Sequence, residues 1–208
     1  NKGVNGTTTV ADVANPMNGW GFGIQGTGFN DTYNLTVSDN GWASIENTAG
    51  NDTISLGAST GTVRLDYRMY DTPVSGVNAN LSTGMIVDGY GGTDTVNGLG
   101  LVGQFEIRLS DETDTVLGSS RDERFILREG NDTLDGAGGW DTLRYDRSGV
   151  GAVNANLATG TASGTWNGNA FVHTISNIEE VRGSRNDGDT LTGDANNNRF
   201  DGRGGNDT

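Results

Sequence analysis

A nine-residue repeat is the feature that most constrains the fold of this chain. Its acidic or amide members stand nine residues apart in two blocks, which are Asp114, Glu123, Asp132 and Asp141, then Asp189, Asn198 and Asp207. Apolar residues follow two positions later, at Val116, Phe125, Leu134, Leu143, Leu191 and Phe200. A period of nine does not match the 3.6-residue turn of an α-helix. It favours very short strands joined by tight turns, so we expect an all-β chain.

Glycines occupy two fixed places in this unit. One set stands five residues before the acidic position, at Gly118, Gly136, Gly193 and Gly202. The other stands two residues before it, at Gly130, Gly139 and Gly205. Glycine reaches positive φ without a Cβ clash, so both sets predict backbone reversals.

Two units make one coil of 18 residues, and successive coils are expected to stack at roughly 4.8 Å. This stacking predicts three acidic pairs, which are Asp114 with Asp132, Glu123 with Asp141, and Asp189 with Asp207. The expected partner of Asn198 lies beyond the last residue of the sequence. Stacked carboxylates repel one another unless a cation lies between them. Calcium takes carboxylate and backbone carbonyl oxygens, so the rows predict calcium sites whose occupation supports folding.

The segments GGWDTLRY, REGNDTLDG and RGGNDT resemble the RTX (hemolysin-type calcium-binding) nonapeptide repeat. The resemblance is strongest over residues 110–145 and 186–208. It implies a parallel β-roll or β-helix solenoid of nonapeptide turns, calcium held between the turns, and type I secretion to the extracellular space. It also implies that the acidic positions supply side-chain oxygens and the glycine turns main-chain oxygens. The acidic set is Asp114, Asp132, Asp141, Asp189 and Asp207, with Glu123 and Asn198 as departures from the pattern.

A longer repeat lies over the short one. VNANLSTG at residues 77–84 recurs as VNANLATG at 153–160, and its alternation predicts half-buried β-spacer strands. We expect a degenerate copy over residues 1–60, a full repeat over 61–142 and a truncated repeat over 143–208, within one continuous solenoid. Asp31 and Asp52 have the turn motif but no carboxylate two nine-residue units further along, so they rank below the two favoured sites, Asp114 with Asp132 and Asp189 with Asp207. Asp94 and His173 occupy corresponding places, and we expect both in spacer loops.

Composition limits the classes of partner. The formal net charge is −14, which disfavours nucleic acid as a partner. There is no cysteine and no stretch apolar enough to span a bilayer. The ragged ends and the partial last repeat suggest a fragment of a larger extracellular protein.

Two alternative functions remain open at this stage. A calcium-dependent adhesin or carbohydrate-binding module, with extracellular polysaccharide or a cell surface as partner, is suggested by the spacers and by Trp20, Trp42, Trp140 and Trp166. A polysaccharide lyase on a β-helix would draw on Arg144 and Arg147. We expect no enzyme, because nothing in the sequence places an acid or nucleophile against His173, the single histidine.

Overall fold

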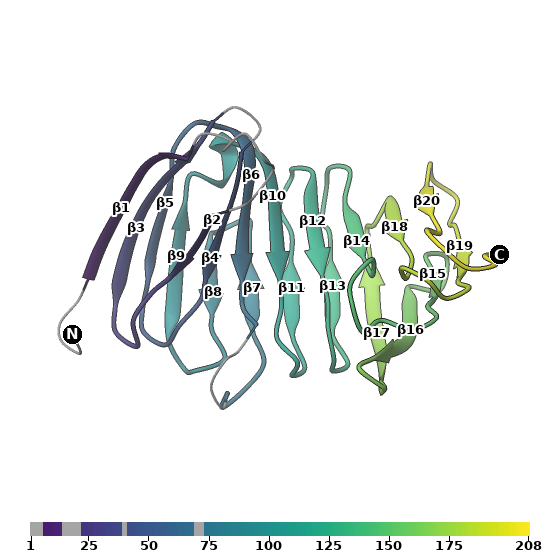
Figure 1. Ribbon diagram of the computed structural model, residues 1–208. Helices are drawn as coiled ribbons and strands as arrows, with labels where there is room; N and C mark the ends of the chain where they lie inside the picture. The colour runs from purple at the N-terminus through teal and green to yellow at the C-terminus, as the bar shows by residue number, and fades with distance from the viewer. Residues whose placement is uncertain (1–5, 14–21, 39–40, 69–72) are drawn as a thin grey trace.

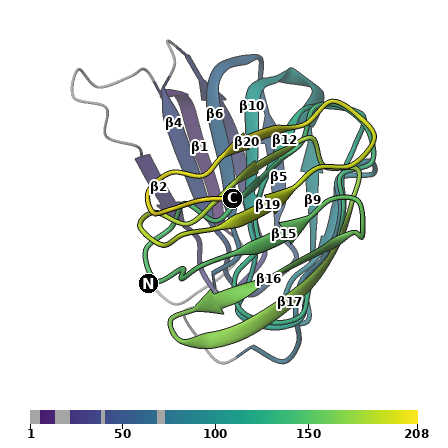
Figure 2. The ribbon, with the colours of Figure 1, turned by 90° about the vertical axis from the view of Figure 1, so that its right-hand side faces the viewer.

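The computed structural model describes residues 6–13, 22–38, 41–68 and 73–208. Within these ranges the chain is all-β, with two sheets and one short 3-10 helix, η1 (Leu99–Leu101). The strands stack side by side along one long axis, with β1 at one end and β19 and β20 at the other (Figure 1). Seen along this axis, successive turns of the chain overlie one another (Figure 2). The predicted all-β class is therefore confirmed.

The two sheets are long and mostly parallel. Sheet A has twelve strands in the spatial order β1 (Gly6–Val13), β3 (Asp31–Val37), β5 (Thr53–Leu56), β9 (Thr93–Asn97), β8 (Met85–Val87), β7 (Asn78–Asn80), β11 (Thr115–Leu117), β13 (Thr133–Asp135), β17 (Asn169–Ser176), β16 (Thr161–Trp166), β15 (Asn154–Asn156) and β19 (Thr190–Thr192). Sheet B has eight strands in the order β2 (Phe22–Gln25), β4 (Trp42–Glu46), β6 (Ser59–Asp66), β10 (Val102–Arg108), β12 (Glu123–Ile126), β14 (Thr142–Arg144), β18 (Glu180–Arg182) and β20 (Arg199–Asp201). β6 and β14 contain the expected segment boundaries at residues 60 and 142, and sheet B continues on both sides of each.

From β11 to β14 the chain passes alternately from one sheet to the other, with one strand per nine-residue unit. β11 pairs in parallel with β13, with Val116 opposite Leu134, and β12 pairs in parallel with β14, with Phe125 opposite Leu143. These four side chains are at most 2% exposed and belong to one core that runs through both sheets. The predicted pairing of every second unit and the inward direction of the apolar residues are confirmed here. Phe200 is 37% exposed because β20 is the last strand of sheet B.

Each spacer adds a three-stranded insert to sheet A. β9, β8 and β7 stand between β5 and β11, and β17, β16 and β15 stand between β13 and β19. The middle strand of each insert is antiparallel to both neighbours. The VNANL segments form β7 and β15 with Ala79 and Ala155 buried, so the predicted spacer strands are confirmed.

The N-terminal region has wider coils than the repeat blocks. In sheet A, Tyr33 pairs with Ile54 and Ile54 pairs with Val96, so each step along the sheet takes more chain than two nine-residue units. In sheet B, Leu65 pairs with Ile107 across a similarly long stretch of chain. The same parallel stacking therefore continues with longer connections. No helix in the described ranges is long and apolar enough to cross a membrane.

Candidate metal centre

The first carboxylate row runs along the start of the parallel strands of sheet A. Its members are Asp31, Asp52, Asp94, Asp114, Asp132, His173, Asp189 and Asp207. All except Asp207 are at most 3% exposed. The row has three runs, Asp31 to Asp94, Asp114 to His173, and Asp189 to Asp207, and within each run the backbone N–H of one member donates to the side chain of the next. The spacer inserts separate the runs, because Asp114 and Asp189 accept instead from the N–H groups of Val77 and Val153. Asp114 N–H donates to Asp132 Oδ1 at 2.9 Å, and Asp189 N–H donates to Asp207 Oδ1 at 2.9 Å, so two predicted pairs come together.

The same row extends through the wide N-terminal coils. Asp31 N–H donates to Asp52 Oδ1 at 2.8 Å, and Asp52 N–H donates to Asp94 Oδ1 at 2.9 Å. Asp31 and Asp52, which have no carboxylate 18 residues further along, therefore still have acidic neighbours in the row. Their neighbours stand 21 and 42 residues away rather than 18, because the intervening loops are longer.

The second carboxylate row follows the start of the sheet B strands and consists of Glu123, Asp141 and Glu179. Glu123 N–H donates to Asp141 Oδ1 at 2.9 Å, which brings together the third predicted pair. Asp141 N–H donates to Glu179 Oε2 at 2.8 Å. Sequence reasoning missed Glu179 because it lies 38 residues from Asp141, across the second spacer. Asn198 bonds within its own turn, where its Oδ1 accepts Asp194 N–H at 2.9 Å.

Asp94 and His173 are corresponding members of the first row, and neither lies in a spacer loop. Each stands in the last strand of its insert, β9 or β17. His173 Nδ1 accepts Asp132 N–H at 3.2 Å, as Asp94 Oδ1 accepts Asp52 N–H. The imidazole is fully buried, and burial lowers the pKa of His173 to about 3, so the ring is neutral. The spacer-loop expectation is corrected because the strand pairing continues through the inserts.

Burial and neighbouring acids perturb both rows. Burial, followed by repulsion from Asp114, raises the pKa of Asp132 to about 8. Burial likewise raises the pKa of Asp141 to about 8 and that of Asp94 to about 7. The pKa values of Asp52 and Asp114 rise to about 6 for the same first reason. Because burial penalises the charged form, the rows without a cation hold protons that ordinary carboxylates would have released.

Several of these carboxylates have an oxygen without a protein donor. The Oδ2 atoms of Asp52, Asp132 and Asp141 are buried and accept no hydrogen bond. By contrast, Asp114 Oδ2 accepts Ser110 N–H at 3.0 Å, and Asp189 Oδ2 accepts Ser184 N–H at 2.7 Å. A buried acceptor with no donor is unfavourable, so these three oxygens are the positions in the rows that can accept a further ligand.

The two glycine sets serve different purposes. In the second set, Gly130, Gly139 and Gly205 have φ of 99°, 121° and 116°, as predicted. In the first set the constraint is space rather than φ, because a Cβ at Gly136 would lie 2.7 Å from Asp141 Oδ2. Gly118, Gly193 and Gly202 likewise face the side chains of Glu123, Asn198 and Asp207. The positive φ expected for this set instead falls one residue later, at Ala137 and Arg203.

The donor set suits a hard cation. Carboxylate oxygens and carbonyls from neighbouring turns are the ligands that calcium takes, and a Cβ at Gly130 would meet both the Glu112 carbonyl and Asp132 Oδ1. No group of three or more His, Asp or Glu side chains that could hold a metal is found among the described residues. Side chains alone therefore do not complete a site, and main-chain oxygens would have to supply the remaining ligands.

The residues named for the alternative functions lie elsewhere. Arg144 is held by Glu106 at 2.6 Å and by Asp146 at 2.8 Å, and Arg147 contacts the same two carboxylates. Of the three described tryptophans, Trp166 is buried, Trp42 lies under Arg64, and Trp140 is 40% exposed. Trp20 lies outside the described residues.

A scan against family models gives no match, and a comparison with curated protein sequences also gives none.

Proposed function

We propose that this chain is a calcium-binding module of the RTX type that folds when it binds calcium outside the cell. The observation that carries the proposal is the set of orphaned Oδ2 atoms on Asp52, Asp132 and Asp141, buried within stacked carboxylate rows. A calcium ion beside each of these atoms would replace the missing donor and neutralise the repulsion along the row.

In this proposal the two sheets are the two sides of a closed β-roll, and calcium lies between adjacent turns. The carboxylates of Asp114, Asp132 and Asp141 and of Asp189 and Asp207 supply side-chain oxygens. Glu123 takes part in the second row, and Asn198 is an uncharged member at the end. The turns around Gly118, Gly130, Gly136, Gly139, Gly193, Gly202 and Gly205 supply main-chain oxygens.

Calcium would couple folding to location. The buried rows resist ionisation in the metal-free fold, so binding calcium must release protons and contributes its free energy to folding. A chain of this kind stays less folded where calcium is scarce and folds where calcium is abundant, which suits a secreted, extracellular protein. We propose a structural role within a larger protein rather than an enzymatic one. The engagement of Arg144 and Arg147 in ion pairs supports this choice.

The test is calorimetric calcium titration with circular dichroism on the same samples. Asp132→Asn is expected to remove at least one binding event and to reduce the stability gained from calcium by about 2–3 kcal/mol, the scale of one buried charged interaction. Glu112→Gln is the matched control, since Glu112 is exposed in the adjacent turn and the substitution removes the same charge. Equal calcium binding by the two variants, or the same β signal in chelator as in calcium, would contradict the proposal.

A further inference from the structure

A cavity of about 240 Å³ opens beside the C-terminal ends of the sheet B strands. Its walls include Arg68, Arg108, Arg128, Arg147, Arg185 and Trp166. No aspartate or glutamate is among the described residues that line it. In a chain with a net charge of −14, five of the 13 Lys and Arg residues gather around this one cavity.

Three of these arginines are held by carboxylates that do not line the cavity. Arg108 bonds to Asp66 at 3.1 Å, and Arg147 bonds to Asp146 at 3.2 Å. Arg128 pairs with Asp111 at 2.6 Å, and its guanidinium carbon lies 5.0 Å from the centre of the Trp166 ring. Arginines fixed in this way lose little further side-chain entropy when a ligand binds.

These contacts leave one buried guanidinium N–H without an acceptor and one arginine without a carboxylate. Arg147 Nε is buried and donates to no acceptor. Arg185 donates from Nε to the backbone carbonyl of Asp146 at 3.0 Å, and no carboxylate of the described chain lies within ion-pair distance of it. Burial, together with neighbouring arginines, lowers the pKa of Arg108 to about 10. The pKa of Arg147 falls to about 10 for the same reasons, with Arg144 as its first charged neighbour.

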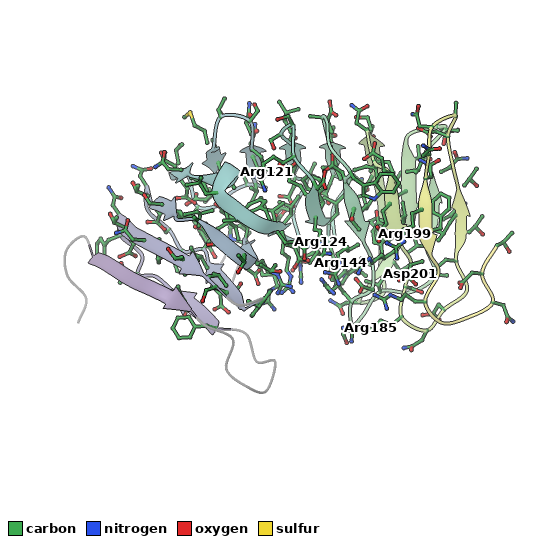
Figure 3. All side chains as sticks on the ribbon, turned by 90° about the horizontal axis from the view of Figure 1, so that it is seen from above. Arg121, Arg124, Arg144, Arg185, Arg199 and Asp201 are labelled. Atoms are coloured by element: carbon green, nitrogen blue, oxygen red, sulfur yellow. The ribbon has the colours of Figure 1, made fainter. Side chains whose placement is uncertain are left out.

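We infer that this cavity binds an oxyanion group (a carboxylate, sulfate or phosphate) of a small acidic ligand. Planar guanidinium groups match such oxygens through paired, charge-assisted hydrogen bonds. The cavity takes a single group or a monosaccharide rather than a polymer strand. Figure 3 shows Arg124, Arg144, Arg185 and Arg199 along the same side of the molecule. The group could belong to a free inorganic anion or to an acidic saccharide, and the test separates these two sources.

The test titrates the full chain, in saturating calcium, with three probes by calorimetry. The probes are inorganic sulfate, a tetrasaccharide of hyaluronan that carries carboxylates only, and neutral chitotetraose. Ionic strength is held constant with chloride, since surface charges respond to salt. We expect sulfate or the acidic saccharide to bind and the neutral saccharide not to bind. Sulfate binding identifies a free oxyanion as sufficient, whereas binding of hyaluronan tetrasaccharide alone identifies the saccharide as the source.

Arg185→Gln is the variant of choice because Arg185 is exposed and makes no ion pair among the described residues, so its loss leaves the packing intact. It is expected to weaken binding of the probe about tenfold, as the loss of one charge-assisted contact. Arg199→Gln is the matched control, because Arg199 also lies on this side but pairs with Glu180. Calcium binding and circular dichroism are expected to be unchanged in both variants, which separates this result from the calcium proposal. Absence of binding by both acidic probes, or equal affinity in the two variants, would overturn the inference.

Discussion

The two spacer inserts share one architecture, but each ends a hydrogen-bonded run of the first carboxylate row with a different side chain. In the first insert, Tyr67 Oη donates to Asp94 Oδ2 at 3.0 Å, and Asp94 receives the N–H of Asp52. In the second insert, His173 takes the place of Asp94, and Tyr145 takes the place of Tyr67. There the aromatic rings stack. The centre of the Phe171 ring lies 4.3 Å from that of His173 and 5.5 Å from that of Tyr145.

This difference shows that the side chains of the row pair with backbone N–H groups whether they are carboxylates or an imidazole. Asp94 and His173 both accept the N–H of the preceding row member, so a neutral imidazole preserves the stacking that a carboxylate provides. The two regions differ in the number of buried acidic side chains. Asp31, Asp52, Asp88 and Asp94 are buried in the first region, whereas the second has Asp114 and Asp132 followed by a neutral ring. The first region should depend more strongly on a cation.

The largest expected effect that separates the two inserts is on the pH dependence of the free energy of unfolding, measured at the lowest calcium concentration at which circular dichroism shows the chain folded. The pKa of His173 is lowered from 6.5 to about 3. Its contribution to the free energy of unfolding is therefore present above pH 6.5 and is lost as the pH falls toward 3. In His173→Asn this loss disappears. Between about pH 7.5 and 5, the free energy of unfolding of the variant should therefore fall by about 2 kcal/mol less than that of the wild type. The measurement is urea unfolding at both pH values.

Asp94→Asn is the matched comparison, and the sign of its effect is opposite. The pKa of Asp94 is raised from 3.8 to about 7, so its contribution is present below 3.8 and is lost as the pH rises through 7. Its replacement should therefore flatten the loss of stability toward neutral pH. If both variants shift the pH profile in the same direction, the two positions do not differ as their surroundings indicate.

The repeat blocks could be predicted from the sequence because their spacing is regular. Two units of nine residues fix which residues stack, so the pairs Asp114 with Asp132 and Glu123 with Asp141 followed from arithmetic and the strand spacing. The apolar residue two positions later also fixed the inward face, as Phe125 and Leu143 demonstrate.

Where loop lengths vary, the same arithmetic fails. Asp52 meets Asp94 across 42 residues and Asp141 meets Glu179 across 38, and no fixed period connects either pair. The arginine-lined cavity could not be predicted from the sequence either. Arg68 and Arg185 are far apart in sequence and come together only when the strands of sheet B stack. Such contacts depend on register, which turns and strand pairing set together.

A smaller expected difference concerns the response of the two regions to calcium removal. The amides of Asp52 and Asp132 are matched, since one donates to Asp94 and the other to His173. Lowering calcium to a concentration at which the chain is still folded should accelerate hydrogen exchange at Asp52 about tenfold more than at Asp132, because one additional close pair of like charges remains in the first region. The measurement is amide exchange by NMR, in saturating and in limiting calcium. A greater acceleration at Asp132 would reverse the proposed order of calcium dependence.

The smallest expected effect comes from removing one hydroxyl in each insert. Tyr67→Phe leaves Asp94 Oδ2 without its donor and should reduce stability by about 1 kcal/mol. Tyr145 Oη is buried without a partner, so Tyr145→Phe should be neutral or stabilising by up to about 1 kcal/mol. Urea unfolding in saturating calcium compares the variants, each of which removes one oxygen atom from a fully buried ring. Equal destabilisation by both substitutions would mean that Tyr145 has a partner comparable to Asp94, and the contrast between a hydrogen-bonded and a ring-stacked insert would not hold.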